Sequence, residues 1–207
     1  MNYTLYICTD RTLMSSLTIE ASVEQAILGG ADVIQLRDKH ASARELYNMA
    51  CSVKKVTDTY HVPLIINDRV DIAAAVDAAG VHLGQSDMPV LAARGILGPD
   101  KIIGVSAATV AEAQSAEAQG ADYLGIGAIY TTVTKQNTRP VTLPLLKEIK
   151  QSVGIPMVAI GGIHADHAAE VAATGVDGIA VVSAVVAQPD IAEAARNMKR
   201  IFQEGRI

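Results

Sequence analysis

Short apolar runs recur along this chain at intervals of about 20 to 35 residues, a spacing typical of β/α units. Most of the runs are continuously apolar rather than alternating, which indicates strands covered on both faces and therefore a parallel sheet. We expect strands at Leu5–Thr9, Val33–Arg37, Leu64–Asn67, Val81–Leu83, Ile102–Val105, Tyr123–Gly127, Met157–Ile160 and Gly178–Val182.

Amphipathic, alanine-rich stretches separate these runs and predict helices. We expect helices at Ile19–Leu28, Ala43–Thr59, Val110–Ala118, Leu143–Ser152, Ala165–Ala173 and Pro189–Phe202. Ser42 and Thr109 suit helix N-caps. A glycine followed by a strand ends several of the helices, and this phrase recurs as Gly29-Gly30-Ala31-Asp32, Ala79-Gly80-Val81, Gly120-Ala121-Asp122 and Gly175-Val176-Asp177. The recurrence indicates a chain built from repeated β/α units.

Eight strands alternating with helices fit either a closed barrel or a doubly wound open sheet. An open sheet usually carries a glycine-rich loop after its first strand, whereas here Thr9-Asp10-Arg11 follows. We therefore expect one α/β domain, a (β/α)8 TIM barrel spanning residues 1–207, which is short for this fold. Half of the residues are hydrophobic, enough for a core without disulfides.

Charge and cysteine content exclude several classes of function. The net charge is −5 and no run of Lys or Arg is present, so we expect no nucleic-acid partner. Cys8 and Cys51 fit no metal-binding spacing, and we interpret them as two buried thiols in a reducing cytoplasm. The start of the chain lacks signal-peptide character and no apolar run approaches about 20 residues. We expect a cytoplasmic protein without membrane contact; a homo-oligomer remains open.

In a barrel of this type the active site lies at the carboxyl ends of the strands. Gln35, Arg37 and Lys39 share one face at the end of the second strand, which suits an anion or a polar substrate. Asp68 and Asp87 follow the third and fourth strands, and a carboxylate pair at neighbouring strand ends suits Mg²⁺. The alternatives are a structural salt-bridge set for the first group and a helix cap for Asp87, which precedes Met88-Pro89.

The later strands carry phosphate-binding features. The segment from Tyr130 to Lys135 is rich in hydroxyls and ends in a cation, although a plain surface loop is the alternative. Gly161-Gly162 and Val182-Ser183 follow the seventh and eighth strands, where this fold recurrently binds phosphate. No histidine is an attractive general base. The carboxylate pair, the cationic and amide groups and the phosphate-binding features, without an obvious base, favour displacement of a pyrophosphate or phosphate group. An enzyme accelerates such a reaction mainly by positioning the substrates and by electrostatic stabilisation.

Seven segments of the chain, which occur in the family's order and cover nearly its full length, resemble the signature segments of the thiamine-phosphate synthases. These are Gln35-Leu36-Arg37-Asp38-Lys39, residues 65–71 around Asn67-Asp68, residues 80–87 ending in Gln85-Ser86-Asp87, Ile103-Gly104-Val105-Ser106, Thr132-Val133-Thr134-Lys135, Ala159-Ile160-Gly161-Gly162-Ile163 and Val181-Val182-Ser183. The resemblance implies that an aminopyrimidine methyl diphosphate loses pyrophosphate and is captured by the nitrogen of a hydroxyethylthiazole phosphate.

The resemblance also implies residue roles. One Mg²⁺ per site would be bound by Asp68 and Asp87. The substrate-binding set would be Gln35, Leu36, Arg37, Asp38, Lys39, Asn67, Ser106, Thr132, Val133, Thr134, Lys135, Gly162, Val182 and Ser183. Within that set Arg37, Lys39, Ser106 and Lys135 would act in catalysis, with Ser106 and Lys135 at the departing pyrophosphate.

Two segments depart from the family pattern. Gly127-Ala128-Ile129-Tyr130-Thr131-Thr132 lacks the two prolines common there, and Ala107-Ala108 follows Ser106 where a polar residue or His is frequent. Three rival functions remain: a thiazole tautomerase, a non-catalytic phosphate-ligand sensor and a sugar-phosphate isomerase. The tautomerase branch tends to lack the metal carboxylates and uses a His after the serine, the sensor could lose the carboxylates and Lys39, and the isomerase should show a clear base at a strand end.

Overall fold

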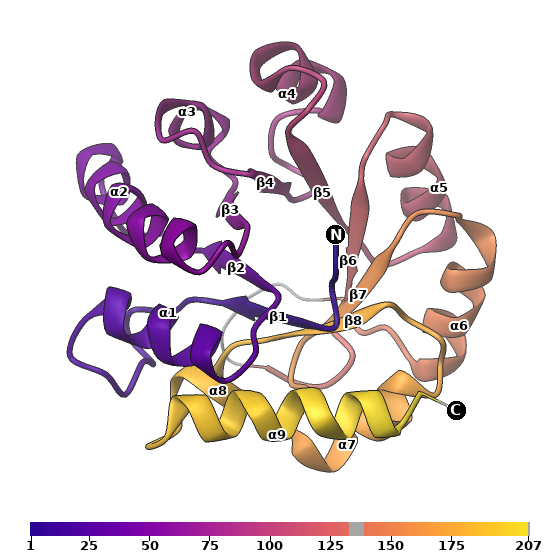
Figure 1. The fold of residues 1–207 in the computed structure, drawn as a ribbon. Helices are drawn as coiled ribbons and strands as arrows, with labels where there is room; N and C mark the ends of the chain where they lie inside the picture. Colours follow the sequence, from indigo (N-terminus) through magenta and orange to yellow (C-terminus); the bar gives the residue numbers. More distant parts are fainter. Residues whose placement is uncertain (133–138, 207) are drawn as a thin grey trace.

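A computed structural model describes residues 1–132 and 139–206 and shows a closed barrel of parallel strands surrounded by helices (Figure 1). The strands are β1 (Leu5–Cys8), β2 (Val33–Leu36), β3 (Leu64–Asn67), β4 (Gly80–Leu83), β5 (Ile102–Ala107), β6 (Tyr123–Ile126), β7 (Met157–Ile160) and β8 (Gly178–Val181). Each strand pairs with the next, and β1 closes the barrel by pairing with β8, with Tyr6 opposite Ala180. The predicted fold class is confirmed.

The helices are α1 (Ile19–Leu28), α2 (Ala43–Thr59), α3 (Val70–Ala75), α4 (Val90–Leu97), α5 (Val110–Ala118), α6 (Leu143–Ser152), α7 (Ala165–Ala172), α8 (Ser183–Val186) and α9 (Ile191–Glu204). Ser42 caps α2 through a reciprocal pair of hydrogen bonds with Glu45, and Thr109 caps α5, as predicted. Within residues 1–132 and 139–206, no helix is long and apolar enough to cross a bilayer.

Some element bounds differ from the predicted ones. The short helices α3, α4 and α8 were not predicted, because six, eight and four residues are too few to show a helical period. The last helix begins at Ile191 rather than Pro189, since the side chain of Asp190 accepts the N–H of Glu193 and fixes the start. The alternative of Asp87 as a helix cap is wrong: α4 starts after Pro89, without a side-chain cap.

The structure explains why an aspartate recurs two residues after a glycine in this chain. Each aspartate lies just before a strand, accepts an N–H from the start of the neighbouring strand and pairs with a cation from an outer helix. The three sets are Asp32 with Leu5 and Lys199, Asp122 with Ile103 and Arg94, and Asp177 with Met157 and Lys150. These side chains satisfy strand ends at the floor of the barrel.

Two apolar layers explain why the strands read as continuously apolar. Side chains such as Leu5, Ile7 and Ile34 point outward and pack against the helices. The alternate positions point inward, where Tyr6 and Tyr123 are almost fully buried. Both faces of each strand are therefore covered.

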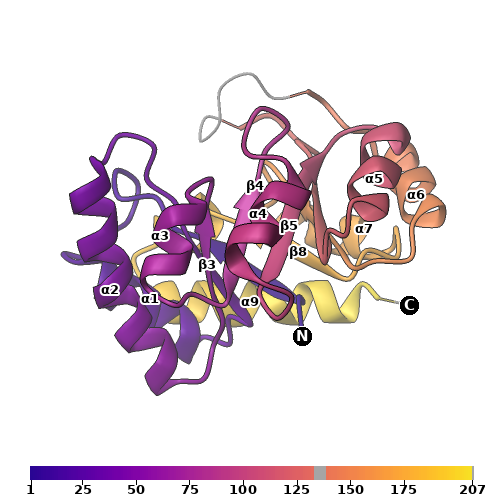
Figure 2. The same ribbon diagram turned by 90° about the horizontal axis from the view of Figure 1, so that it is seen from above.

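Glycines on the inner face make room for large inward side chains. A Cβ on Gly104 would lie 2.1 Å from Cζ of Tyr123, and one on Gly125 would lie 2.9 Å from Cε1 of His82. Figure 2 shows the N-terminus and the end of α9 on one side of the barrel. Because Met1 leads into β1, that side is the floor, and the carboxyl ends of the strands open on the other side.

We predict that Gly104→Ala lowers the free energy of unfolding by about 1–3 kcal/mol, because the buried Tyr123 ring must move. The matched control is Gly95→Ala in the exposed part of α4, where no atom lies within 4 Å of the new Cβ. The control should raise stability by about 0.5–1 kcal/mol, the difference in helix propensity. Urea unfolding measures both, and an unchanged midpoint for Gly104→Ala would contradict the packing argument.

Candidate active site

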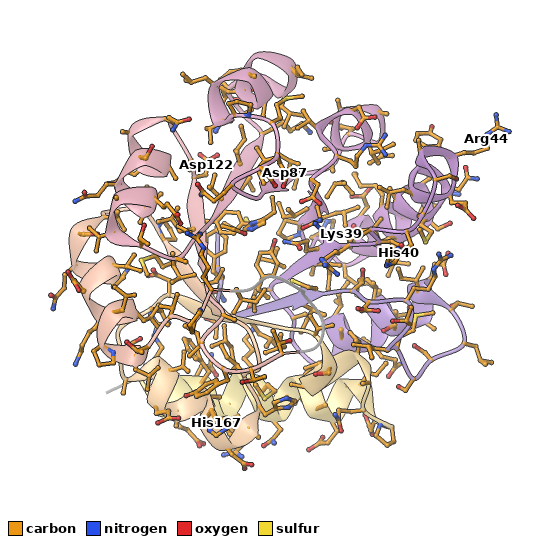
Figure 3. The ribbon with its side chains drawn as sticks, turned by 180° about the vertical axis from the view of Figure 1, so that it is seen from behind. Lys39, His40, Arg44, Asp87, Asp122 and His167 are labelled. Carbon is orange, nitrogen blue, oxygen red and sulfur yellow. The ribbon has the colours of Figure 1, made fainter. Side chains whose placement is uncertain are left out.

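A cavity of about 570 Å³ opens at the carboxyl ends of the strands and continues into the barrel. Every strand, or the segment directly after it, contributes to its lining. Figure 3, which looks from the side opposite to Figure 1, shows Lys39 and Asp87 near the mouth, whereas Arg44 points outward from α2. A cavity of this size suits two small ligands bound together.

An acidic pair and a lysine form one wall of the cavity. Nζ of Lys39 lies 3.1 Å from Oδ2 of Asp68, and Oδ2 of Asp87 accepts the N–H of Gly84 at 2.6 Å. Burial, and then the neighbouring carboxylate of Asp68, raise the pKa of Asp87 above its usual value, although the Gly84 N–H opposes this. Two carboxylates that destabilise each other's charge suit a divalent cation.

The backbone holds Asp68 in an uncommon conformation. Its φ is +62°, in the left-handed region that side chains rarely adopt, and its N–H donates to the carbonyl of His82 at 2.8 Å. This turn directs the carboxylate toward Lys39 and Asp87. Among residues 1–132 and 139–206 no group of three or more Asp, Glu, His or Cys could hold a metal ion. A cation bound by this pair would complete its shell with water and substrate oxygens, as Mg²⁺ typically does.

A chain of hydrogen bonds crosses the barrel interior beneath the cavity. Gln35 Nε2 donates to the Tyr6 hydroxyl at 2.8 Å, and the Tyr6 and Tyr123 hydroxyls lie 2.7 Å apart. Nδ1 of His82 lies 2.9 Å from the Tyr123 hydroxyl, and Nε2 of His82 lies 2.9 Å from Oγ of Ser106. Burial raises the pKa of both tyrosines well above the usual value, so both phenols stay neutral.

One direction of donation uses every hydrogen of this chain. Tyr6 accepts from Gln35, so its own hydrogen can be donated to Tyr123, whose hydrogen can in turn be donated to Nδ1 of His82. The other ring nitrogen of His82 faces Oγ of Ser106. Ser106 also lines the cavity, where its hydroxyl can donate to an anionic oxygen.

The opposite wall is built from backbone. Gly161 and Gly162 have φ of +103° and +63°, and Cβ atoms there would lie 2.6 Å from Cβ of Ala128 and 2.5 Å from the carbonyl oxygen of Thr131. Only glycine fits both the conformation and the space. Thr132 and Ser183 also line this wall, which offers backbone and hydroxyl groups to a phosphate.

Arg139 and Glu112, which both line the cavity, form an ion pair. Both guanidinium nitrogens of Arg139 contact Glu112, at 2.5 Å and 2.8 Å, and Oε2 of Glu112 also accepts the N–H of Ala108 at 2.9 Å. The guanidinium is the main cause that lowers the pKa of Glu112. The pair ties the chain after β6 to the start of α5.

Comparison with known proteins identifies the family of this chain. The family model described as Thiamine monophosphate synthase matches residues 5–185. The chain is 51% identical to the thiamine-phosphate synthase of Clostridium beijerinckii over 202 residues, covering 98% of this chain and 97% of that one. It is 52% identical to that of Ruminiclostridium cellulolyticum, covering 98% and 96%. The chain belongs to the thiamine monophosphate synthase family.

Structural similarity agrees with this family. The thiamine phosphate pyrophosphorylase from Pyrococcus furiosus superposes with a TM-score of 0.90 at 44% identity, covering 98% of this chain and 96% of that one. The geranylgeranylglyceryl phosphate synthase from Thermoplasma acidophilum, at 16% identity and a TM-score of 0.71, shares the fold alone. The chain is therefore an enzyme, a transferase of the thiamine-phosphate synthase type in thiamine biosynthesis.

The structure brings most of the predicted site residues of this thiamine monophosphate synthase family member to the cavity. Those that line it are Gln35, Arg37, Lys39, Asn67, Asp68, Asp87, Ser106, Thr132, Gly162, Val182 and Ser183. Leu36 and Asp38 do not line it: Leu36 packs outward under the helices, and Asp38 pairs with Arg11 at 3.0 Å. Val133, Thr134 and Lys135 lie outside the described residues.

Sequence reasoning missed several residues of the cavity, among them His82, Tyr6, Tyr123, Glu112 and Arg139. His82 lies inside β4 rather than at its carboxyl end, where the sequence places candidate site residues. Its signal was the alternation along β4, because Val81 and Leu83 face outward and so His82 must face the barrel interior. No local sequence pattern predicted the Glu112–Arg139 ion pair, because its two residues are 27 positions apart.

We predict that Tyr6→Phe lowers the free energy of unfolding by about 1–3 kcal/mol, because the buried amide of Gln35 loses its acceptor. Tyr47→Phe on the exposed side of α2 is the control and should stay within about 0.5 kcal/mol of the parent. Denaturant unfolding followed by circular dichroism gives both values. Equal stability of the two variants would show that the interior chain contributes nothing.

Proposed function

We propose that this enzyme catalyses the Mg²⁺-dependent condensation of an aminopyrimidine methyl diphosphate with hydroxyethylthiazole phosphate. The bond between the pyrimidine methylene carbon and the diphosphate oxygen breaks, pyrophosphate leaves, and the lone pair of the thiazole nitrogen forms the new carbon–nitrogen bond of thiamine phosphate. The observation that carries the proposal is one cavity with Asp68, Asp87 and Lys39 on one wall and the Gly161-Gly162 backbone on the other. The two walls suit a metal-bound diphosphate and a second phosphate.

Asp68 and Asp87 would hold the Mg²⁺. Their mutual proximity supports this, since like charges at short range destabilise each other unless a cation lies between them. When bound, the ion would neutralise charge on the diphosphate and so make pyrophosphate a better leaving group. Lys39 lies beside the same pair and would add a second positive charge to the diphosphate.

The remaining residues would divide the two substrates between them. Gln35, Arg37, Lys39 and Asn67 would hold the pyrimidine diphosphate, and Ser106 would donate its hydroxyl hydrogen to the departing pyrophosphate, together with Lys135. Thr132, Gly162, Val182 and Ser183 would hold the thiazole phosphate, as would Val133 and Thr134 of the adjoining segment. Leu36 and Asp38, which lie outside the cavity lining, would only support Arg37 between them.

This assignment needs no general base. The thiazole nitrogen already carries the lone pair that forms the bond, so the protein has to position two substrates and stabilise charge on the leaving group. The buried tyrosines keep the floor of the cavity neutral, because burial raises the pKa of both. A neutral floor, with charged groups such as Lys39 and Asp68 beyond the strand ends, would direct the diphosphate outward and the pyrimidine ring inward.

The first test is pyrophosphate release by the purified protein with both substrates, with Mg²⁺ and then with a chelator. We expect release only when both substrates and the metal are present, with thiamine phosphate formed in equal amount. Release from the pyrimidine diphosphate alone would contradict the coupled reaction. Folded protein that releases nothing would refute the proposal and leave the tautomerase or the phosphate-sensor function.

The second test addresses the metal site. Asp68→Asn and Asp87→Asn should each lower Mg²⁺-dependent turnover on the order of 100-fold, the usual effect of removing one electrostatic group from a reaction site. Asn suits the left-handed backbone at position 68 and keeps the bond from Gly84 at position 87, so the fold should persist. Asp71→Asn, an exposed carboxylate paired with Arg69, is the control. Wild-type turnover in either site variant would exclude that carboxylate as a ligand.

A further inference from the structure

The segment after β6 is attached to the end of β7 through its backbone. The N–H of Ile129 donates to the carbonyl of Ile160 at 3.0 Å, and the N–H of Tyr130 donates to the carbonyl of Gly161 at 2.9 Å. These two bonds lie beyond the paired residues of β6 and β7 and hold Ile129 and Tyr130 against the glycine pair.

The side chain of Tyr130 leaves the cavity and reaches α7. Its hydroxyl donates to Oε1 of Glu170 at 2.5 Å, and its ring stacks on the ring of His167 with centroids 4.4 Å apart and an interplanar angle of 27°. Nδ1 of His167 lies 3.5 Å from the same Glu170 oxygen. Burial and the bond to Glu170 raise the pKa of Tyr130, so the phenol keeps its hydrogen as the donor. Figure 3 shows His167 at the periphery of the molecule, on α7.

Tyr130, which contacts α7, is only two positions away from Thr132, which lines the cavity. A Cβ on Gly162 would lie 2.9 Å from Cβ of Tyr130 and 2.5 Å from the Thr131 carbonyl oxygen, so this backbone lies in direct contact with Gly162. Thr132, the next residue, lines the cavity with Gly162, whereas Tyr130 does not line it. The anchor of Tyr130 on α7 therefore acts together with these backbone bonds on the separation between Thr132 and the glycine pair.

We propose that Tyr130, held by Glu170 and His167, is a positioning residue for the thiazole-phosphate half of the site. This inference rests on the function proposed above and assigns a specific task to a cluster outside the cavity. A phosphate bound by several donors needs each of them at hydrogen-bond distance, so a small displacement of one wall weakens the whole set. Within the described part of the chain, no hydrogen bond or ion pair joins this cluster to the opposite wall with Lys39, Asp68 and Asp87.

Tyr130→Phe keeps the ring on His167 and removes only the hydroxyl. We expect the KM and the directly titrated Kd for hydroxyethylthiazole phosphate to rise about 5-fold, in line with loss of a hydrogen bond to a charged acceptor at a partly exposed site. The KM for the pyrimidine diphosphate should stay within about 2-fold, since a wall remote from α7 binds it. A fold defect would change both constants, so the split between them separates positioning from general structure.

The chain offers a matched control. The hydroxyl of Tyr60, just after α2, donates to Oε1 of Glu24 on α1 at 2.7 Å. This is the same kind of bond from a tyrosine outside a helix to a glutamate on one, and neither residue lines the cavity, so Tyr60→Phe should leave both constants unchanged. Glu170→Ala removes the acceptor and should raise the KM and Kd for hydroxyethylthiazole phosphate as much as Tyr130→Phe does. The double variant should bind no more weakly than either single variant. Glu170→Gln should partly restore binding, because its amide oxygen can accept the same hydrogen bond.

The outcomes separate this inference from the function on which it rests. If the wild-type chain neither binds nor converts the thiazole phosphate, the proposed function fails and the inference fails with it. If the wild type is active but Tyr130→Phe and Glu170→Ala bind thiazole phosphate as the wild type does, only the inference is overturned. Equal changes in the two KM values would also overturn it.

Discussion

The pairing of β1 with β8 is the constraint on which the rest of this structure depends. Closure gives every strand two neighbours, so the backbone groups of the strands are satisfied without a free edge. It also brings eight strand ends to one rim. Asp68 and Ser183, which are far apart in sequence, thereby line one cavity. The site exists because the sheet closes.

Closure also creates an interior that must be filled, and this chain fills it unevenly. Tyr6 and Tyr123 occupy the lower part, where Gly104 provides space for the Tyr123 ring. Their hydroxyls are paired with each other, with Gln35 and with His82, so burial leaves no hydrogen of the two phenols unused. The same chain continues through His82 to Oγ of Ser106, so the packed interior is connected directly to a residue that lines the cavity.

The cavity separates two kinds of binding group. The wall at β2 to β4 carries charge, with Lys39 beside the acidic pair, while the wall at β7 offers backbone at Gly161 and Gly162. A charged wall suits a diphosphate with a cation, and a backbone wall suits a phosphate monoester. Tyr130 and Arg139 attach the chain between these walls to α7 and α5, so the outer helices contribute to the geometry of the site without lining its centre.

Much of this arrangement could be read from local sequence. The continuous apolar runs predicted parallel strands, and capping residues such as Ser42 and Thr109 predicted helix starts, because these features depend on neighbours within a few residues. The same locality identified Lys39, Asp68 and Asp87 as polar residues at strand ends. It failed for α3 and α8, which are too short to show a period, and it gave no reason to connect Asp87 with the N–H of Gly84.

The sequence by itself determined the repeated β/α pattern and the type of residue at each strand end, since both are set by period and by immediate neighbours. Only the tertiary structure decided which inward residues meet. The Tyr6–Tyr123–His82 chain, the Glu112–Arg139 pair and the Tyr130–Glu170 anchor each join residues separated by 27 to 117 positions. Such contacts depend on barrel closure and strand register, and no local pattern encodes them.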